Sequence, residues 1–412
     1  MGLSFVRVVR AVHRFSMDVS IGVRGKDMDP RTAKVCIVVA IAAAAAAGIG
    51  IFCLTSENDN HKDTFEITIT GIDSFGNYAL DLNDKTFEEH GMKIGEVFEL
   101  DIQGKKCKGQ MTTLYSGTPL FGLFINGDNG VYNMGMFCYD ITAVVDCPAG
   151  TKFTLTHEGK ISENIEKIPA YMNGYSDNPS DYGDMAVFAN FREVDVEGIK
   201  EDTFYRAASP YPTYGTQRHV YVNQYLEKEG VEYLLIMNVD LDKVKDQWPT
   251  DCYSYKLLQE GKVIAKKYSP SIFNYPDQVA EFMETIADSE GKLGISCALG
   301  KDRTGFYVAM LEALAGASYK EIREDFMETL CNFYAIEPFG EEYQTLATML
   351  IDPVFYIFEN PSIAKDPTTV DWSELKLDVD SVDAYKVVYD YLMKQVGISE
   401  ETIQSVIDRV SE

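Results

Sequence analysis

The sequence predicts an α/β domain with a central, mostly parallel sheet flanked by helices and a helical C-terminal part. A small all-β domain and one N-terminal transmembrane helix are expected to precede it. Three observations lead to this prediction: a long uncharged stretch near the N-terminus, then short alternating runs punctuated by glycines, then longer helical patterns between short apolar runs. With 46% hydrophobic and 25% charged residues, the composition is that of a folded chain.

Changes in composition divide the 412 residues into five segments. These are a basic cytoplasmic leader (1–34), the uncharged stretch (35–54), a polar linker (55–63), the all-β barrel or sandwich domain (64–165) and the α/β domain (166–412). The net charge of −27 argues against nucleic acid or an anionic membrane surface as the main partner, because binders of phosphate backbones need a basic face. A small local anion site is compatible with this charge.

The uncharged stretch 35–54 is long enough to cross a bilayer, since a helix that rises about 1.5 Å per residue would span about 30 Å. Lys34 and Arg31 precede it, and Glu57 follows it. The positive-inside bias therefore places the leader in the cytoplasm and residues 55–412 outside. Two alternatives stay open: an uncleaved anchor that holds the protein at the membrane, or a cleaved signal that leaves it secreted.

Strand-like runs fill the segment 64–165. In Thr64–Thr70, apolar residues alternate with polar ones, which is typical of a half-buried strand. The further runs are Gly76–Leu82, Val97–Ile102, Leu120–Ile125, Ile141–Val145 and Phe153–His157. Glycines separate them at intervals typical of hairpins, so this segment is predicted to be a barrel or a sandwich.

Helical patterns dominate the segment 166–412. They cover Val220–Glu229, Pro276–Ser289, Thr304–Ala315, Tyr319–Phe333, Glu341–Ile351, Val382–Gln395 and Glu400–Val410. Two short apolar runs, Glu232–Met237 and Leu293–Ser296, lie between helices. This alternation favours a parallel sheet with helices on its faces.

The most informative pattern begins where the run Leu293–Ser296 ends. Cys297 comes next, Arg303 follows after five further residues, and a helix is expected from about Thr304. A cysteine-dependent phosphatase needs this arrangement. The helix N-terminus favours the cysteine thiolate, and the guanidinium fork can hold two phosphate oxygens. The Thr304 hydroxyl can hydrogen-bond the sulfur when it becomes a leaving group.

The residues between the cysteine and the helix are expected to bind the phosphate through inward-turned backbone N–H groups. The predicted substrate-binding residues are Ala298, Leu299, Gly300, Lys301 and Thr304. Glycine at position 300 permits the tight turn that such a loop requires. No metal-binding motif is apparent, and the five histidines are scattered, so neither a metal nor another cofactor is expected.

The segment 296–305, S-C-A-L-G-K-D-R-T-G, resembles the H-C-x-x-G-K-D-R-T-G loop of the bacterial exported tyrosine and dual-specificity protein phosphatases. Upstream, N-F-R-E-V at 190–194 and T-F-Y-R-A-A-S at 203–209 are similar to that family's N-F-R-D and L-Y-R-S segments. The resemblance implies a phosphocysteine mechanism. Cys297 would be the nucleophile, Arg303 the phosphate clamp and Asp302 the proton donor, with Lys301 adding positive charge at the mouth of the loop.

Two positions depart from the family pattern. Ser296 stands where the family has histidine, and the run Ile236-Met237-Asn238 stands where the family often carries D-L-R on the strand, so that aspartate is absent. Asp251, in a W-P-T-D sequence, is an alternative general acid to Asp302. These departures leave a second hypothesis open, in which a weak or inactive module binds phosphorylated ligands and the β domain is the interaction unit.

The expected partners are a phosphorylated protein or a small phosphoester, such as a phosphoinositide, and a membrane through the N-terminal segment. Six cysteines lie beyond the uncharged stretch, and their spacing does not decide whether any of them pair.

Overall fold

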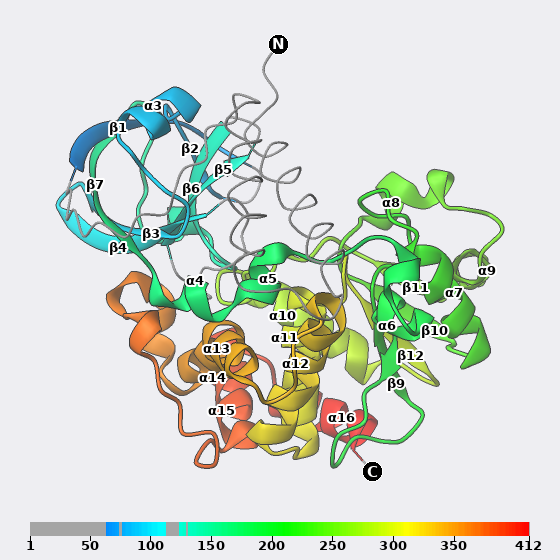
Figure 1. Ribbon diagram of the computed structural model, residues 1–412. Helices are drawn as coiled ribbons and strands as arrows, with labels where there is room; N and C mark the ends of the chain where they lie inside the picture. Colours follow the sequence, from blue (N-terminus) through cyan, green and yellow to red (C-terminus); the bar gives the residue numbers. More distant parts are fainter. Residues whose placement is uncertain (1–62, 74–75, 113–122, 129–130, 412) are drawn as a thin grey trace, which may run out of the picture. The chain divides into compact units, whose positions relative to one another are not determined.

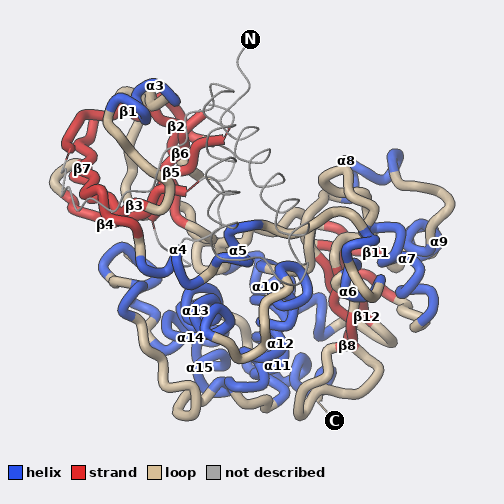
Figure 2. Tube along the Cα trace, viewed as in Figure 1, coloured by secondary structure: helices blue, strands red, loops and turns tan. Residues whose placement is uncertain are grey.

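The structure, a computed structural model, describes residues 63–73, 76–112, 123–128 and 131–411. Figure 1 traces the chain in sequence colours, and Figure 2 separates its helices from its strands. The strands form two sheets, a closed barrel and a five-stranded open sheet.

The barrel is built by the first part of the described chain (Figure 1). Its strands are β1 (Asp63–Ile72), β2 (Tyr78–Leu80), β3 (Glu96–Ile102), β4 (Lys105–Thr112), β5 (Leu123–Asp128), β6 (Val131–Met136) and β7 (Lys152–Ile161). They follow one another around the barrel in the order β1-β2-β6-β5-β4-β3-β7, and the pairing of β7 with β1 closes it. Among the described strands of the barrel, only β4 and β5 pair in parallel. Alternate side chains, such as Ile67 with Ile69 and Phe98 with Leu100, are buried.

One strand prediction in this region is wrong. The run Ile141–Val145 contains a 3-10 turn at Ile141–Ala143 instead. The Asp140 side chain accepts hydrogen bonds from the Thr142 amide at 3.0 Å and from its hydroxyl at 2.6 Å, which favours a turn over extended backbone.

The open sheet has the order β11-β10-β12-β9-β8. Its strands are β8 (Arg192–Glu193), β9 (Phe204–Ala207), β10 (Tyr233–Ile236), β11 (Val263–Ala265) and β12 (Leu293–Ser296). β9 to β12 run parallel and β8 runs antiparallel to β9. The three central strands end in register, since Ser296 pairs with Ile236 on one side and with Ala207 on the other.

Helices cover both faces of this sheet. The longer ones are α7 (Arg218–Lys228), α9 (Tyr253–Gln259), α10 (Pro276–Ala287), α11 (Asp302–Ala315), α12 (Tyr319–Tyr334), α13 (Glu341–Leu350), α14 (Asp352–Glu359), α15 (Ala384–Tyr391) and α16 (Glu400–Val410). One face packs against α7 and α9, through Leu234, Val222 and Leu257. The other packs against α10 and α11, through Leu235, Ile295 and Phe282. Helix α11 contacts α12, α15 and α16 and is buried along most of its length.

Helix α16, the last helix, is hydrogen-bonded to the segments that lead into strands β9 and β12. The Lys200 amide donates to the Val410 carbonyl at 2.8 Å, shortly before β9 begins. The Arg409 guanidinium donates to the carbonyls of Ser289 at 2.9 Å and Gly291 at 2.6 Å, just before β12. Helix α16 therefore ties together the approaches to two central strands.

The predicted fold class is wrong as stated. It included a membrane-spanning helix, and the stretch 35–54 assigned to it lies outside the described residues. Among the helices that the structure does describe, none combines the length and the apolar character needed to cross a bilayer. The all-β part expected before the α/β domain is a closed seven-stranded barrel in the described residues, so the chain as a whole is not a single α/β fold.

Candidate active site

Cys297 is the first residue after β12, the middle strand of the open sheet. Its side chain is buried, and helix α11 begins at Asp302. Ligand sites of open parallel sheets lie at the carboxyl ends of the strands, so the segment 297–303 occupies the expected position for such a site. We call this segment the catalytic loop.

The backbone carbonyls of the catalytic loop are held in place by hydrogen bonds from neighbouring segments. Four consecutive carbonyls accept hydrogen bonds: Ala298 from the Ser209 amide at 3.4 Å, Leu299 from Asn190 Nδ2 at 3.0 Å, Gly300 from Arg206 Nη2 at 3.2 Å and Lys301 from the Gly305 amide at 2.7 Å. The C=O and N–H groups of one peptide unit point in opposite directions. Each of the following amides, at 299–302, therefore points away from the partner of its own peptide unit, an arrangement compatible with an anion-binding nest.

Gly300 makes this turn possible. Its φ of +69° lies in the left-handed region, and a Cβ there would come within 2.4 Å of the Ala207 carbonyl oxygen. A glycine is therefore required both by the backbone conformation and by the close approach of β9.

Arg303 is held at the edge of the loop. Its Nη1 donates to the Met237 carbonyl at 2.8 Å and to the Tyr268 carbonyl at 3.3 Å. These carbonyls follow β10 and β11, so the ends of two neighbouring strands fix one edge of the guanidinium. The planar group has a second edge, formed by Nε and Nη2, with the geometry that suits two phosphate oxygens.

Lys301 is largely buried, with 9% of its surface exposed. Its ammonium lies 5.6 Å from the ring centre of Tyr171 and 5.8 Å from that of Tyr334, and 3.6 Å from Asp302 Oδ1. Burial disfavours its charge, but the Asp302 carboxylate and the surrounding phenols together outweigh burial and hold the pKa of Lys301 well above its usual value. The ammonium therefore stays charged between two aromatic rings.

Two hydroxyls next to the loop are buried. Neither Ser296 Oγ nor Thr304 Oγ1 has a hydrogen-bond partner in the part of the chain that the structure describes. Thr304 lies in the first turn of α11, where a hydroxyl can reach toward the loop. Its predicted bond to the cysteine sulfur stays a prediction.

The alternative acid, Asp251, is exposed and lies in the turn before α9. The Trp248 before it is buried, donates from Nε1 to Ser254 Oγ at 3.0 Å and packs against Tyr211. Asn238 follows β10 and donates from Nδ2 to Thr213 Oγ1 at 3.2 Å. Of the two acid candidates, only Asp302 belongs to the catalytic loop.

Sequence reasoning missed the residues that support the loop from helix α12. Asp325 accepts from the Arg192 and Arg206 guanidiniums, and Thr329 Oγ1 accepts from Arg192 Nη1 at 3.1 Å. One signal was available: β9 is buried at all four positions yet contains Arg206, and a buried charge needs a partner. The partner, Asp325, is distant in sequence from Arg206, so it could not be predicted from the sequence.

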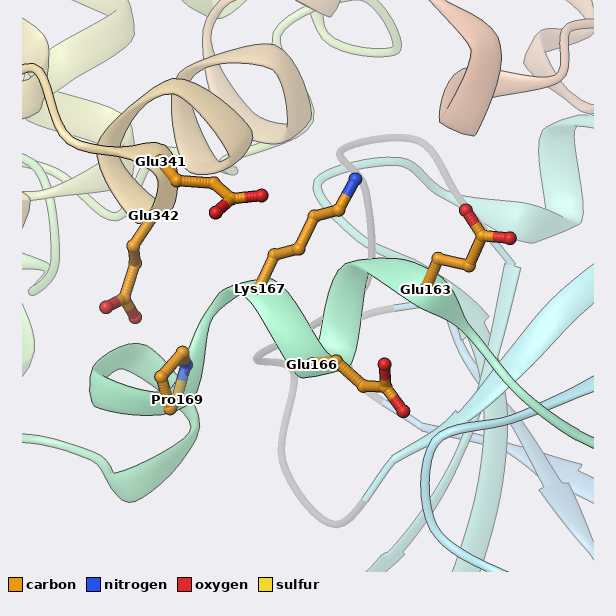
Figure 3. A pocket seen from close by; sticks show the side chains of 6 residues that line it. All are labelled: Glu163, Glu166, Lys167, Pro169, Glu341 and Glu342. Atoms are coloured by element: carbon orange, nitrogen blue, oxygen red, sulfur yellow. The ribbon is translucent and has the colours of Figure 1, made fainter.

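A cavity of about 720 Å³ lies elsewhere, at helices α4 (Glu163–Lys167), α5 (Pro169–Asn173) and α13 (Figure 3). Its lining residues are Glu163, Glu166, Lys167, Pro169, Glu341 and Glu342. Four carboxylates against one ammonium disfavour a phosphate ligand, and no residue of the catalytic loop lines this cavity.

Within the described ranges, no group of three or more histidine, cysteine, aspartate or glutamate side chains could hold a metal ion. All six cysteines that the structure describes are free: Cys107, Cys138, Cys147, Cys252, Cys297 and Cys331.

A loop between a central parallel strand and a helix N-terminus is a common position for a phosphate-binding site. Residues 197–412, more than half of the chain, match the tyrosine phosphatase family. The chain belongs to this family and is a tyrosine-phosphatase-like hydrolase of phosphoric monoesters. The match confirms the family that the loop predicted, and it does not bear on the bacterial, exported origin that the resemblance implied.

The comparison with curated proteins finds no match to this chain. Among solved structures, the chain is similar to an uncharacterized conserved protein from Thermotoga maritima, at 15% identity and a TM-score of 0.21. The likeness covers 22% of this chain and 35% of that one, so it spans about a third of that protein and carries no argument about function.

Proposed function

We propose that the chain hydrolyses phosphotyrosine in proteins, or a related phosphomonoester, through a phosphocysteine on Cys297. The observation that supports the proposal is the set of four hydrogen-bonded carbonyls at 298–301. The amides of the same peptide units point the other way, and we infer that they converge on one centre. A phosphoryl group at that centre would accept hydrogen bonds from these amides and from the free edge of Arg303.

In the first step, the Cys297 thiolate attacks phosphorus, and the bond to the leaving oxygen breaks. Asp302, the first residue of α11 and partly exposed, is our choice of proton donor to that oxygen; it acts in its protonated form, and Asp251 is the alternative donor. In the second step, water attacks phosphorus and gives a proton to the Asp302 carboxylate while the S–P bond breaks, which returns the thiolate, restores the acid and releases inorganic phosphate. The N-terminus of α11 and Arg303 stabilise the sulfur anion in both steps.

The test is hydrolysis of an aryl phosphate by the full chain with EDTA present. Cys297→Ser should abolish turnover, and a phosphoryl adduct should appear on the Cys297 peptide of acid-quenched wild type in mass spectrometry. Cys331→Ser is the matched control, because Cys331 is a half-buried cysteine on α12 outside the loop. Full activity in Cys297→Ser, or loss of activity on chelation, would overturn the proposal.

A second candidate function is phosphate binding without turnover. It is favoured by Ser296, whose buried hydroxyl occupies the position of the family's histidine and has no partner among the described residues. If this function is correct, calorimetry should detect phosphate binding by the full chain. The same chain should release no phosphate from an aryl ester at any pH.

A further inference from the structure

Arg206 is the charged residue within the buried strand β9, and 1% of its surface is exposed. Its guanidinium makes contacts in two directions. Nη2 donates to the Gly300 carbonyl at 3.2 Å, and Nη1 donates to Asp325 Oδ2 on α12. Arg206 therefore links a peptide of the catalytic loop to a helix that has no residue in the loop.

A second path leads from the same aspartate to the next peptide of the loop. Arg192 Nε donates to Asp325 Oδ1 at 3.0 Å, and its Nη1 donates to Asn190 Oδ1 at 3.1 Å. Asn190 Nδ2 in turn donates to the Leu299 carbonyl at 3.0 Å. Two neighbouring carbonyls of the loop are thus held through one buried carboxylate.

The acids around the two arginines differ in their ionisation. Burial would raise the pKa of Asp325, but Arg192 and Arg206 outweigh it and lower that pKa to about 2, so this carboxylate is ionised. Glu312 on α11 is fully buried, and neither of its oxygens faces a hydrogen-bond donor among the described residues. Burial raises the pKa of Glu312 well above its usual value, and Asp325 adds to the rise. Two guanidiniums thus face the carboxylate of Asp325 and the neutral acid of Glu312, and Arg192 Nε also lies 3.5 Å from the carboxylate of Glu328.

The Gly300 carbonyl is the part of the loop that this cluster controls most directly. Glycine with positive φ tolerates a wide range of backbone angles, so the peptide between residues 300 and 301 is free to rotate unless it is held. Rotation would turn the carbonyl oxygen into the nest and the Lys301 amide out of it. A phosphate would then lose a donor and face a like partial charge.

We propose that Arg206 is a positioning residue, which holds the Gly300 carbonyl out of the nest and is itself fixed by Asp325 on α12. Arg206 does not touch the substrate. The inference rests on the proposed function, because it assumes that the loop binds phosphate.

The experiment compares Arg206→Lys with the wild-type full chain, using inorganic phosphate as a competitive inhibitor of aryl phosphate hydrolysis. Lysine keeps the charge but cannot reach Gly300 and Asp325 with one planar fork. The inhibition constant for phosphate and KM should both rise on the order of 10-fold, with a smaller change in kcat, as expected for the loss of a charge-assisted hydrogen bond.

Arg323→Lys is the matched control. Arg323, on α12, is buried like Arg206 and likewise pairs with an aspartate. Its Nε donates to Asp352 Oδ1 at 2.9 Å, and it does not contact the loop. It should lower thermal stability without changing the inhibition constant. If Arg206→Lys fails to fold, Asn190→Gly removes the Leu299 contact, tolerates the φ of 48° at that position and should weaken phosphate inhibition in the same way.

An inhibition constant within about twofold of wild type in a folded Arg206→Lys variant would overturn the proposal, because a lost charge-assisted bond costs more than that. An equal rise in Arg323→Lys would also overturn it, since the effect would then be general loss of rigidity. A wild-type chain that neither hydrolyses the ester nor binds phosphate would instead refute the proposed function, and the two failures are therefore distinguishable.

Discussion

Glu312 shows how a single buried residue can influence a site that it does not enter. It lies on α11, faces Asp325, Arg206 and Arg192, and has no access to solvent. In the folded chain it retains a proton, because a second charged carboxylate beside Asp325 would be buried without a donor. The unfolded chain releases that proton above a pH of about 4.5, the ordinary value for glutamate.

The stability of the wild type should therefore decrease as the pH rises from 4.5 toward the raised folded value, since only the folded state binds the proton in that window. The slope from this residue is at most about 1.4 kcal/mol per pH unit. Glu312→Gln removes this contribution and offers Asp325 an N–H donor. The free energy of unfolding of the variant should exceed that of wild type by at least about 1 kcal/mol at pH 7, and the difference should shrink on acidification.

Urea titrations at several pH values measure this difference. Glu341→Gln is the control, because Glu341 is exposed at the start of α13 and should give a small, flat difference. A Glu312→Gln variant whose stability relative to wild type is constant or falls with rising pH would show that Glu312 is ionised in the folded chain.

At the scale of elements, the position of the catalytic loop depends on the close packing of α11 against α12. The two helices meet at Gly305 in the first turn of α11, where a Cβ would come within 2.6 Å of the Phe326 ring. Phe306 stacks on the same ring, at 5.8 Å between centroids. The glycine thus lets α12, which contains Asp325, approach the loop.

Gly305→Ala should displace Phe326 and with it Asp325, at a cost of about 1–3 kcal/mol in the free energy of unfolding, as for overpacking in other cores. KM for an aryl phosphate should rise as well, because the residues that hold the loop carbonyls move. Thermal unfolding and steady-state kinetics measure the two effects. Gly183→Ala is the control, since a Cβ at that position meets nothing within 4 Å. Unchanged stability in Gly305→Ala would contradict tight packing at this contact.

At the scale of the whole molecule, the net charge of −27 opposes the approach of acidic substrates to an anion-binding loop. At low salt, kcat/KM for phosphotyrosine peptides with basic flanking residues should therefore be on the order of 10-fold higher than kcat/KM for peptides with the same core and acidic flanking residues. The gap should narrow with added sodium chloride, since charges are screened over about 10 Å at 0.1 M. A preference that does not change with salt would instead indicate direct contacts with the flanking residues.

The catalytic loop was predictable from the sequence because its signal is local. A short apolar strand, Cys297, the glycine at 300 and an apolar helix follow one another without interruption. The support for the loop was not predictable, because Asn190, Arg206 and Asp325 are brought together only by the sheet and α12. Closure of the barrel likewise depends on pairing between strands distant in sequence, here β1 with β7. In both cases the unpredicted contacts are long-range ones.

The attachment of α16 has a consequence for how the protein is made. The strand that carries Cys297 leaves the ribosome well before Arg409 and Val410, which anchor the approaches to β12 and β9. Until those late residues emerge, β9 and β12 lack this tether. Hydrolytic capacity should therefore be acquired late in biogenesis.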